Sequence, residues 1–211
     1  ERFGHYQPAD LGAEGRGQWL WVHAVSLGET RAAAILLQAL RDLHPGLKLL
    51  LTHGTATGRA EGKKLLRPGD IQVWQPWDSL GATRRFVRQF QPVAGVLMET
   101  EIWPNLLAAC REAGVPVALA NARLSERSAR GYARFARLTA PMLAELSLIA
   151  VQTDAEAERF RQLGARTEAV QVTGSIKFDL TIDPALPQRA NELRATWQPA
   201  GRPVWIAAST H

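Results

Sequence analysis

The chain has 211 residues, of which 46% are hydrophobic and 21% charged, a composition that fits a folded protein and excludes global disorder. Its single cysteine, Cys110, excludes a disulfide framework and a metal site built from cysteines. The net charge of +5 comes mainly from arginine, whose planar guanidinium matches phosphate and carboxylate groups. This excess favours an anionic partner, although an arginine-rich codon usage explains it equally well.

Short apolar runs alternate with longer helical stretches. The runs at residues 19–25, 48–52, 71–75, 93–98, 115–120, 148–152 and 169–173 predict strands. The stretches at 29–43, 58–66, 80–90, 103–113, 125–146 and 155–163 predict helices. Because nearly continuous apolar strands alternate with helices, we expect an α/β fold with a parallel sheet covered on both faces.

The composition changes after Leu180. Four prolines surround a short helical stretch at 188–197, and residues 204–208 then indicate a new strand. We therefore expect one domain over residues 1–180, a linker over 181–203 and the start of a second domain over 204–211. No run of 18 apolar residues predicts a membrane span. The chain opens at Glu1 without a methionine, so we expect an N-terminal segment, such as an anchor, to be missing.

Ligands of open α/β sheets bind beyond the carboxyl ends of the strands, so the residue that follows each strand matters most. After the first expected strand, Gly28 permits a tight turn and Glu29 falls in the first turn of a helix. The helix dipole favours an ionised carboxylate there, which could take a proton from an attacking hydroxyl. The commoner role for such a glutamate is to cap its helix. The turn lacks the GxGxxG spacing of a dinucleotide site.

Two further turns carry polar groups. The hydroxyls of Thr55 and Thr57, with the backbone N–H groups before a helix, suit an anion or a sugar, although an ordinary turn is the commoner alternative. After the fourth expected strand, Glu99 and Glu101 beside Trp103 form a platform for sugar hydroxyls. One of these two carboxylates could instead cap the next helix.

Basic residues follow the fifth and seventh expected strands. Arg123 and four later arginines are spaced alternately by four and three residues, so a continuous helix over 125–146 places them on one face. The further members of this stripe are Arg127, Arg130, Arg134 and Arg137. The stripe predicts contact with anions or a membrane, and a solvated helix face is the alternative. Lys177 could neutralise a phosphate or carboxylate, or pair with Asp179. The histidines lack metal-ligand spacing, so we expect no metal site.

Six motifs occur in a fixed order along the chain. They are Ser26-Leu27-Gly28-Glu29, Thr55-Ala56-Thr57-Gly58, Met98-Glu99-Thr100-Glu101-Ile102-Trp103-Pro104-Asn105, Asn121-Ala122-Arg123-Leu124-Ser125, Gly174-Ser175-Ile176-Lys177-Phe178-Asp179 and Ala207-Ala208-Ser209-Thr210-His211. Each motif is weak alone, but the ordered set closely resembles the 3-deoxy-D-manno-octulosonic acid (Kdo) transferases. The resemblance runs over effectively the whole chain.

This resemblance implies the Rossmann-like N-terminal half of a GT-B glycosyltransferase. Residues 1–180 would bind the acceptor, and residues 204–211 would begin the donor-binding domain. Such enzymes are metal-independent, need no cofactor, and move Kdo from CMP-Kdo to a lipid A precursor (lipid IVA) with inversion in lipopolysaccharide assembly. They work at the cytoplasmic face of the bacterial inner membrane, usually with an N-terminal anchor. Because the donor-binding domain would be cut just after its first strand, we expect this chain alone to be inactive.

The resemblance also implies roles for individual residues. Glu29 matches the catalytic base. The positions that match the acceptor site are Ser26, Gly28, Thr55, Thr57, Glu99, Glu101 and Arg123. The positions that match the donor side are Lys177, Ser209, Thr210 and His211. Independently of the resemblance, the charge of the stripe Arg127, Arg130, Arg134 and Arg137 suits an anionic membrane surface.

Three other classes of protein compete with this interpretation. One is another GT-B nucleotide-sugar glycosyltransferase or an epimerase. A second is a basic α/β module that binds nucleic acid, which the lack of a nucleic-acid motif and the small number of aromatic residues disfavour. The third is a dinucleotide-dependent oxidoreductase, which the missing glycine fingerprint disfavours. We therefore expect no nucleic-acid partner.

Overall fold

The computed structural model describes residues 1–7, 17–180, 183–197, 205 and 207–208. The chain divides into two compact units, Glu1–Phe178 and Asp179–His211. The larger unit contains every strand found in the described residues, and it carries the candidate site.

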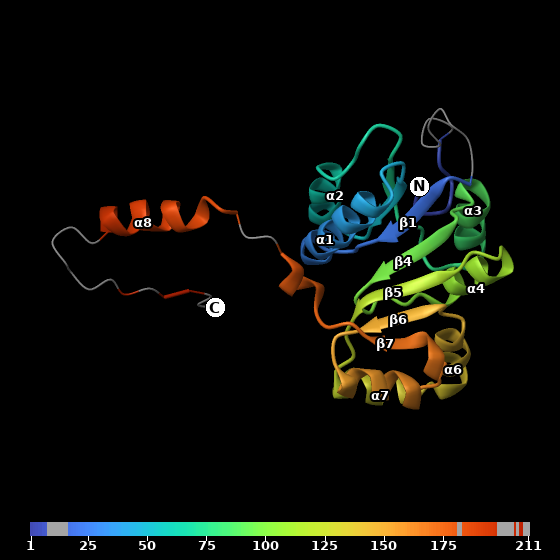
Figure 1. Ribbon diagram of the computed structural model, residues 1–211. Coiled ribbons are helices and arrows are strands. Elements are labelled where there is room, and N and C mark those ends of the chain that lie inside the picture. The colour runs from blue at the N-terminus through green and yellow to red at the C-terminus, as the bar shows by residue number, and fades with distance from the viewer. Residues whose placement is uncertain (8–16, 181–182, 198–204, 206, 209–211) are drawn as a thin grey trace. The chain divides into compact units, whose positions relative to one another are not determined.

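The larger unit is built on one parallel sheet, which Figure 1 shows with its helices. Its seven strands in the described residues are β1 (Trp19–His23), β2 (Lys48–His53), β3 (Ile71–Trp74), β4 (Ala94–Met98), β5 (Val117–Ala122), β6 (Leu148–Val151) and β7 (Val170–Val172). Their spatial order is β3-β2-β1-β4-β5-β6-β7. The chain thus builds outward from β1 to one edge, then returns and builds outward from β4 to the other. The order reverses between β1 and β4, which is where open α/β sheets bind ligands.

Helices connect the strands on both faces of the sheet. They are α1 (Leu27–Leu43), α2 (Ala56–Lys63), α3 (Leu80–Phe90), α4 (Pro104–Glu112), α5 (Glu126–Ala133), α6 (Ala136–Ala144) and α7 (Asp154–Gln162). Short 3₁₀ turns occur at η2 (Thr167–Ala169) and η3 (Ile176–Asp179). The predicted alternation of strands and helices is confirmed, with boundaries shifted by only a few residues.

Two hydrophobic cores explain why the strands are apolar along their whole length. On one face, Trp21 of β1 packs with Phe86 and Phe90 of α3 in a cluster that continues into α4, α6 and α7. On the other face, Val22 packs in a second cluster with Leu37 of α1. Neighbouring residues of one strand point to opposite faces, so both must be apolar when helices cover both sides.

One predicted element is wrong. The single helix expected over residues 125–146 is two helices, because Phe135 leaves the helical conformation at φ −115° and ψ 36°. Gly131, a poor helix former, precedes the break. The carbonyl of Tyr132 then accepts hydrogen bonds from the backbone N–H of Phe135 at 3.0 Å and from the hydroxyl of Thr139 at 3.1 Å, which stabilises the junction.

The smaller unit contains one described helix, α8 (Leu186–Trp197), close to the helical stretch expected at 188–197. Most of the strand expected over 204–208 lies outside the described residues, and Trp205 itself is exposed and not in a strand. None of the helices in the described parts of the chain is long and apolar enough to cross a membrane.

Candidate active site at the carboxyl edge of the sheet

Glu29 is held in the first turn of α1 by hydrogen bonds to both carboxylate oxygens. The hydroxyl of Ser26, the N-cap residue, donates to Glu29 Oε1 at 2.8 Å and accepts from the Glu29 backbone N–H at 3.3 Å. The backbone N–H of Val25 donates to Oε2 at 2.8 Å. This reciprocal arrangement is a variant of the capping box. Glu29 is only 8% exposed. The hydrogen bonds of the cap therefore hold a nearly buried carboxylate at the carboxyl end of β1.

The tight turn expected at Gly28 does not occur. Gly28 lies inside α1, and a Cβ added there would meet only the Ser26 Oγ, at 3.9 Å. Because Gly28 has no side chain, the surface of the first turn of α1 beside Ser26 stays open to solvent.

The β2–α2 turn packs against the loop that carries Glu29. The Thr55 hydroxyl donates to the carbonyl of Val25 at 2.8 Å and accepts from the backbone N–H of Gly58 at 3.1 Å. A Cβ at Gly58 would lie 2.6 Å from the Val25 carbonyl oxygen, so only glycine allows this approach. Thr55 is thus occupied as a helix cap, whereas Thr57 is exposed.

Two carboxylates follow β4, next to β1. Glu99 adopts a left-handed backbone with φ 57°, which is uncommon for a residue other than glycine. Glu101 is half-buried, and its pKa is raised, first by burial, then by the negative charge of Glu29 and by that of Glu99, while the indole N–H of Trp103 opposes this shift. Glu29, Glu99 and Glu101 therefore lie close enough to interact at the point where the strand order reverses.

Tyr132 is a site residue that sequence reasoning missed. Burial raises the pKa of its phenol, and the nearby charge of Glu101 raises it further. Trp103, two residues after Glu101, buries its indole nitrogen without a hydrogen-bond partner of normal geometry among the described residues. Tyr132 belongs to no motif and comes from α5, so only the folded chain brings it to Glu101.

The two basic residues expected at the site lie near Glu99 and Thr100. Lys177 Nζ lies 3.8 Å from Glu99 Oε1, so the ion pair considered with Asp179 is replaced by one with an expected acceptor residue. The Arg123 side chain is exposed, and its carbonyl accepts a hydrogen bond from the Thr100 hydroxyl at 2.5 Å. Ser209, Thr210 and His211 lie outside the described residues.

Two buried histidines lie at the carboxyl ends of β1 and β2. Burial lowers the pKa of His23 to about 3 and that of His53 to about 4, so both are neutral at neutral pH. His53 Nδ1 lies 2.8 Å from the carbonyl of Ala24 and must carry the proton, because a carbonyl only accepts. His23 Nδ1 lies 2.9 Å from the Thr52 hydroxyl. In the described residues, no group of three or more His, Cys, Asp or Glu side chains could hold a metal ion.

The arginine stripe is wrong as a feature of one helix. Arg127 and Arg130 lie on α5, Arg134 ends that helix, and Arg137 lies on α6 beyond the break. All four side chains are exposed, and Arg130 pairs with Glu126 at 3.4 Å. At the junction, Phe135 and Leu138 are also exposed, by 69% and 58%. This surface is therefore both basic and apolar.

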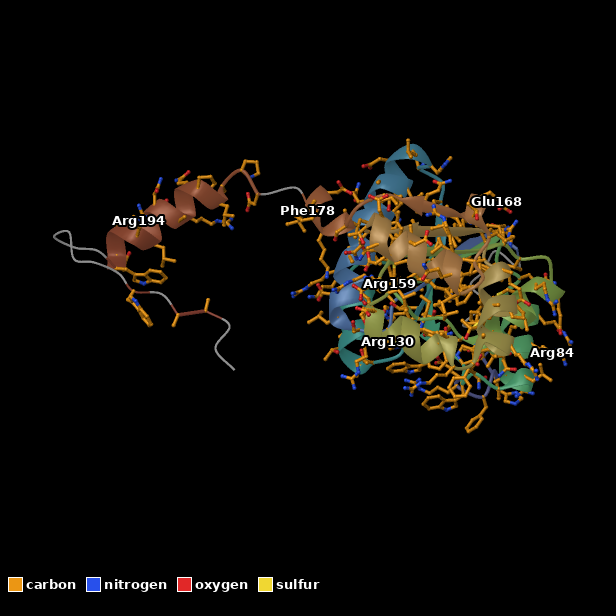
Figure 2. The ribbon with its side chains drawn as sticks, turned by 90° about the horizontal axis from the view of Figure 1, so that it is seen from below. Arg84, Arg130, Arg159, Glu168, Phe178 and Arg194 are labelled. Carbon is orange, nitrogen blue, oxygen red and sulfur yellow. The ribbon has the colours of Figure 1, made fainter. Side chains whose placement is uncertain are left out.

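Two cavities lie away from the carboxylates. One, of about 560 Å³, lies between α5 and α7, where Arg130 and Arg159 both line it; Figure 2 labels both residues. The other, of about 700 Å³, lies beside the amino ends of β4 and β5. Arg84 of its wall pairs with Glu112 at 2.7 Å, and Figure 2 shows Arg84 far from Phe178 in the larger unit.

The fold and this edge define a Rossmann-like α/β domain of the GT-B type. Two solved structures share the fold: Staphylococcus aureus MnaA in a co-structure with UDP, and UDP-GlcNAc 2-epimerase from Neisseria meningitidis bound to UDP-GlcNAc. Their TM-scores are 0.55 and 0.54, their identities 15% and 16%, and they match 82% and 84% of this chain and 51% of each of their own chains. The predicted fold class is confirmed.

The family model described as 3-deoxy-D-manno-octulosonic-acid transferase (kdotransferase) matches residues 1–180, and the chain belongs to this family. The 3-deoxy-D-manno-octulosonic acid transferase of Bordetella pertussis is 48% identical over 99% of the chain, and that of Haemophilus influenzae 36% over 100%. The alignments cover 47% and 48% of these two relatives. The chain thus spans about half the length of the curated relatives it matches, and the resemblance stated from the motifs is confirmed.

Proposed function

We propose that the full protein is an inverting glycosyltransferase that moves Kdo from CMP-Kdo to the lipid A precursor lipid IVA in lipopolysaccharide assembly. The observation that carries this proposal is the meeting of Glu29, Glu99 and Glu101 at the strand-order reversal, in a chain that belongs to the Kdo transferase family. The coarse reaction class follows from the relatives, and the donor, the acceptor and the residue roles are our inference.

Glu29 acts as the base in this proposal. Its carboxylate takes the proton of an acceptor hydroxyl while that oxygen bonds to the anomeric carbon of Kdo. The bond from this carbon to the CMP phosphate oxygen breaks on the opposite side, and CMP leaves with the bonding electrons, which inverts the anomeric centre. The helix cap is compatible with this step, because each carboxylate oxygen accepts one hydrogen bond and keeps a second lone pair.

The other residues of the edge bind the acceptor. Glu99 and Glu101 accept hydrogen bonds from sugar hydroxyls, with Trp103 and Tyr132 beside them. Arg123 offers an exposed guanidinium to the acceptor phosphates, which suit its planar fork. The donor binds mainly to a domain that begins at about residue 204, including Ser209, Thr210 and His211. No metal or cofactor takes part in the proposed step.

The test is a transfer assay with the full-length protein. CMP-Kdo and lipid IVA should give a Kdo-bearing lipid product in the presence of EDTA, whereas UDP-GlcNAc should be neither a donor nor epimerised. The 211-residue chain alone should be inactive, because it spans about half the length of its relatives and would hold only the start of the proposed donor domain. Epimerisation of UDP-GlcNAc without Kdo transfer would overturn the proposal in favour of the enzymes that share the fold.

We also propose that the protein works at an anionic membrane surface, at the cytoplasmic face of the bacterial inner membrane. The surface formed by Arg127, Arg134 and Arg137 with the exposed Phe135 and Leu138 supports this, because cations attract acidic lipids and apolar side chains enter the interface.

Co-sedimentation with vesicles that contain acidic lipids tests this location. Each basic residue near such a surface contributes about 1 kcal/mol, so reversing Arg134 and Arg137 together should weaken binding by at least roughly tenfold. Reversal of Arg31, an exposed residue of α1 on the other face of the sheet, is the matched control and should have little effect. Unchanged binding of the double variant would remove this surface from the proposal.

A further inference from the structure

The carboxyl ends of β4 and β5 share an unusual backbone conformation. Glu99 and Asn121 have φ values of 57° and 53°, and the only other described residue besides glycine with positive φ is Gln91. Such conformations persist where the surroundings fix them, and they concentrate at functional sites. The two residues lie on neighbouring strands, because the backbone N–H of Glu99 donates to the carbonyl of Ala120 at 2.9 Å.

Asn121 connects this edge to the turn that carries Lys177. Its side chain is almost wholly buried, at 4% exposure, and its Oδ1 accepts from Gln152 Nε2 at 3.0 Å and from the backbone N–H of Ile176 at 3.2 Å. A backbone N–H can only donate, so the oxygen of Asn121 must face Ile176. Its amide nitrogen is buried without a partner in the described part of the chain.

The ion pair between Lys177 and Glu99 cannot account for the position of the turn. Its atoms are 3.8 Å apart and the Lys177 side chain is 56% exposed, and exposed pairs of this kind contribute little by themselves. The hydrogen bond from the Ile176 N–H to Asn121 is instead partly buried, with its acceptor on an almost wholly buried side chain, and it lies one residue before Lys177. A buried acceptor is costly to leave without its hydrogen bond, so this bond is better able to hold the turn.

We propose that Asn121 is a positioning residue that holds Lys177 beside Glu99, so that Lys177 serves the anionic groups of the acceptor rather than those of the donor. This inference rests on the proposed transfer function and deepens it. It moves Lys177, which the family resemblance places on the donor side, to the acceptor side of the site. Asn121 itself touches no substrate and acts through the turn.

The first experiment measures the exchange of the Ile176 amide hydrogen by NMR in the 211-residue chain. Asn121→Gly keeps the left-handed backbone without strain but removes the acceptor oxygen, so exchange should become about fivefold faster or more. Asn121→Asp keeps an acceptor oxygen and should preserve the protection. Gln91→Gly is the matched control, because it relieves the same backbone conformation at a residue far from Ile176 in sequence. Unchanged exchange in Asn121→Gly, or fast exchange in Asn121→Asp, would overturn the positioning role.

The second experiment uses the full-length enzyme and separates the two substrates. Asn121→Gly and Lys177→Ala should each raise the KM for lipid IVA several-fold, with the KM for CMP-Kdo unchanged and kcat within about twofold. Gln91→Gly should change none of these values. A rise in the KM for CMP-Kdo would return Lys177 to the donor side. A wild-type enzyme that transfers no Kdo would remove the proposed function and the acceptor role together, and the amide exchange would still decide whether Asn121 holds the turn.

Discussion

The loops after β1 and β6 begin their helices with the same local structure, but only one of them lies at the candidate site. Ser26 and Glu29 cap α1, and Thr153 and Glu156 cap α7, in each case with the hydroxyl and carboxylate bonded to each other. Glu29 lies beside two other carboxylates at the strand-order reversal, whereas Glu156 bonds to the backbone N–H of Leu124 at 3.2 Å. A capping pattern therefore defines local geometry, and the place of its strand in the sheet decides whether the glutamate can do chemistry.

The largest expected effect is a difference between the two capping glutamates, Glu29 and Glu156, in the transfer assay. Glu29→Gln, which keeps one acceptor oxygen for the cap but cannot take a proton, should lower kcat of the full-length enzyme by about 100-fold or more. Glu156→Gln is the matched control, because it alters the same cap at α7. Its kcat should stay close to that of the wild type. Equal losses in the two variants would mean that Glu29 acts only through helix capping.

The second largest effect concerns stability in acid, to which His23 and His53 near the loop after β1 contribute. In the unfolded chain His23 and His53 take up protons near pH 6.5. In the folded chain burial lowers the pKa of His23 to about 3 and that of His53 to about 4. Their contribution is full above pH 6.5 and falls with pH by up to about 1.4 kcal/mol per pH unit for each histidine. Urea unfolding at several pH values measures this slope, which His53→Gln should reduce and exposed His44→Gln should not.

Amide exchange localises the same effect. Since His53 bonds to the carbonyl of Ala24, acid should loosen residues 25–29 before residues 153–156, where no histidine is nearby in sequence. Exchange measured at pH 7 and at pH 4.5 compares the two loops in one sample. Faster acid exchange in the α7 cap than in the α1 cap would contradict this account.

Much of this architecture can be predicted from the sequence. The strands are apolar along their length because both faces are buried, and that pattern, with its turn residues, places every strand within a few residues. The capping partners of Glu29 are also a local property, encoded by the spacing of Ser26 and Glu29.

Other features are visible only in the folded chain. Helical periodicity alone extended the arginine stripe past Phe135, where the chain leaves the helical conformation and the Tyr132 carbonyl accepts the bonds that hold the junction. Tyr132 reaches Glu101, and Asn121 bonds to Ile176 across 55 residues, only because β4, β5 and the last turn meet at one edge. The strand order, which identifies that edge, is likewise a property of the folded chain.

A smaller effect tests whether the two caps are equal as local structures. Ser26→Ala and Thr153→Ala should each lower the free energy of unfolding by about 1 kcal/mol, because each removes one helix-capping hydroxyl. Ser79, the N-cap residue of α3, makes no side-chain capping bond, so Ser79→Ala is the control and should change little. Urea unfolding at pH 7 measures all three. A much larger loss in Ser26→Ala would show that the α1 cap has additional partners.

The smallest effect concerns the carboxylates that distinguish the α1 loop from the α7 loop. Burial and then the charge of Glu29 raise the pKa of Glu101 in the folded chain. The folded chain therefore binds this proton more tightly than the unfolded chain does. Stability falls as the pH rises from the unfolded pKa to the higher folded pKa. Glu101→Gln removes the charge and should therefore stabilise the protein at pH 7 but not at pH 4. Glu158→Gln, on the exposed surface of α7, is the control and should shift stability little at either pH. If Glu101→Gln destabilises the protein at pH 7, a cation or hydrogen-bond donor stabilises the carboxylate by more than its burial costs. The repulsion among the carboxylates at this edge would then be relieved before any substrate binds.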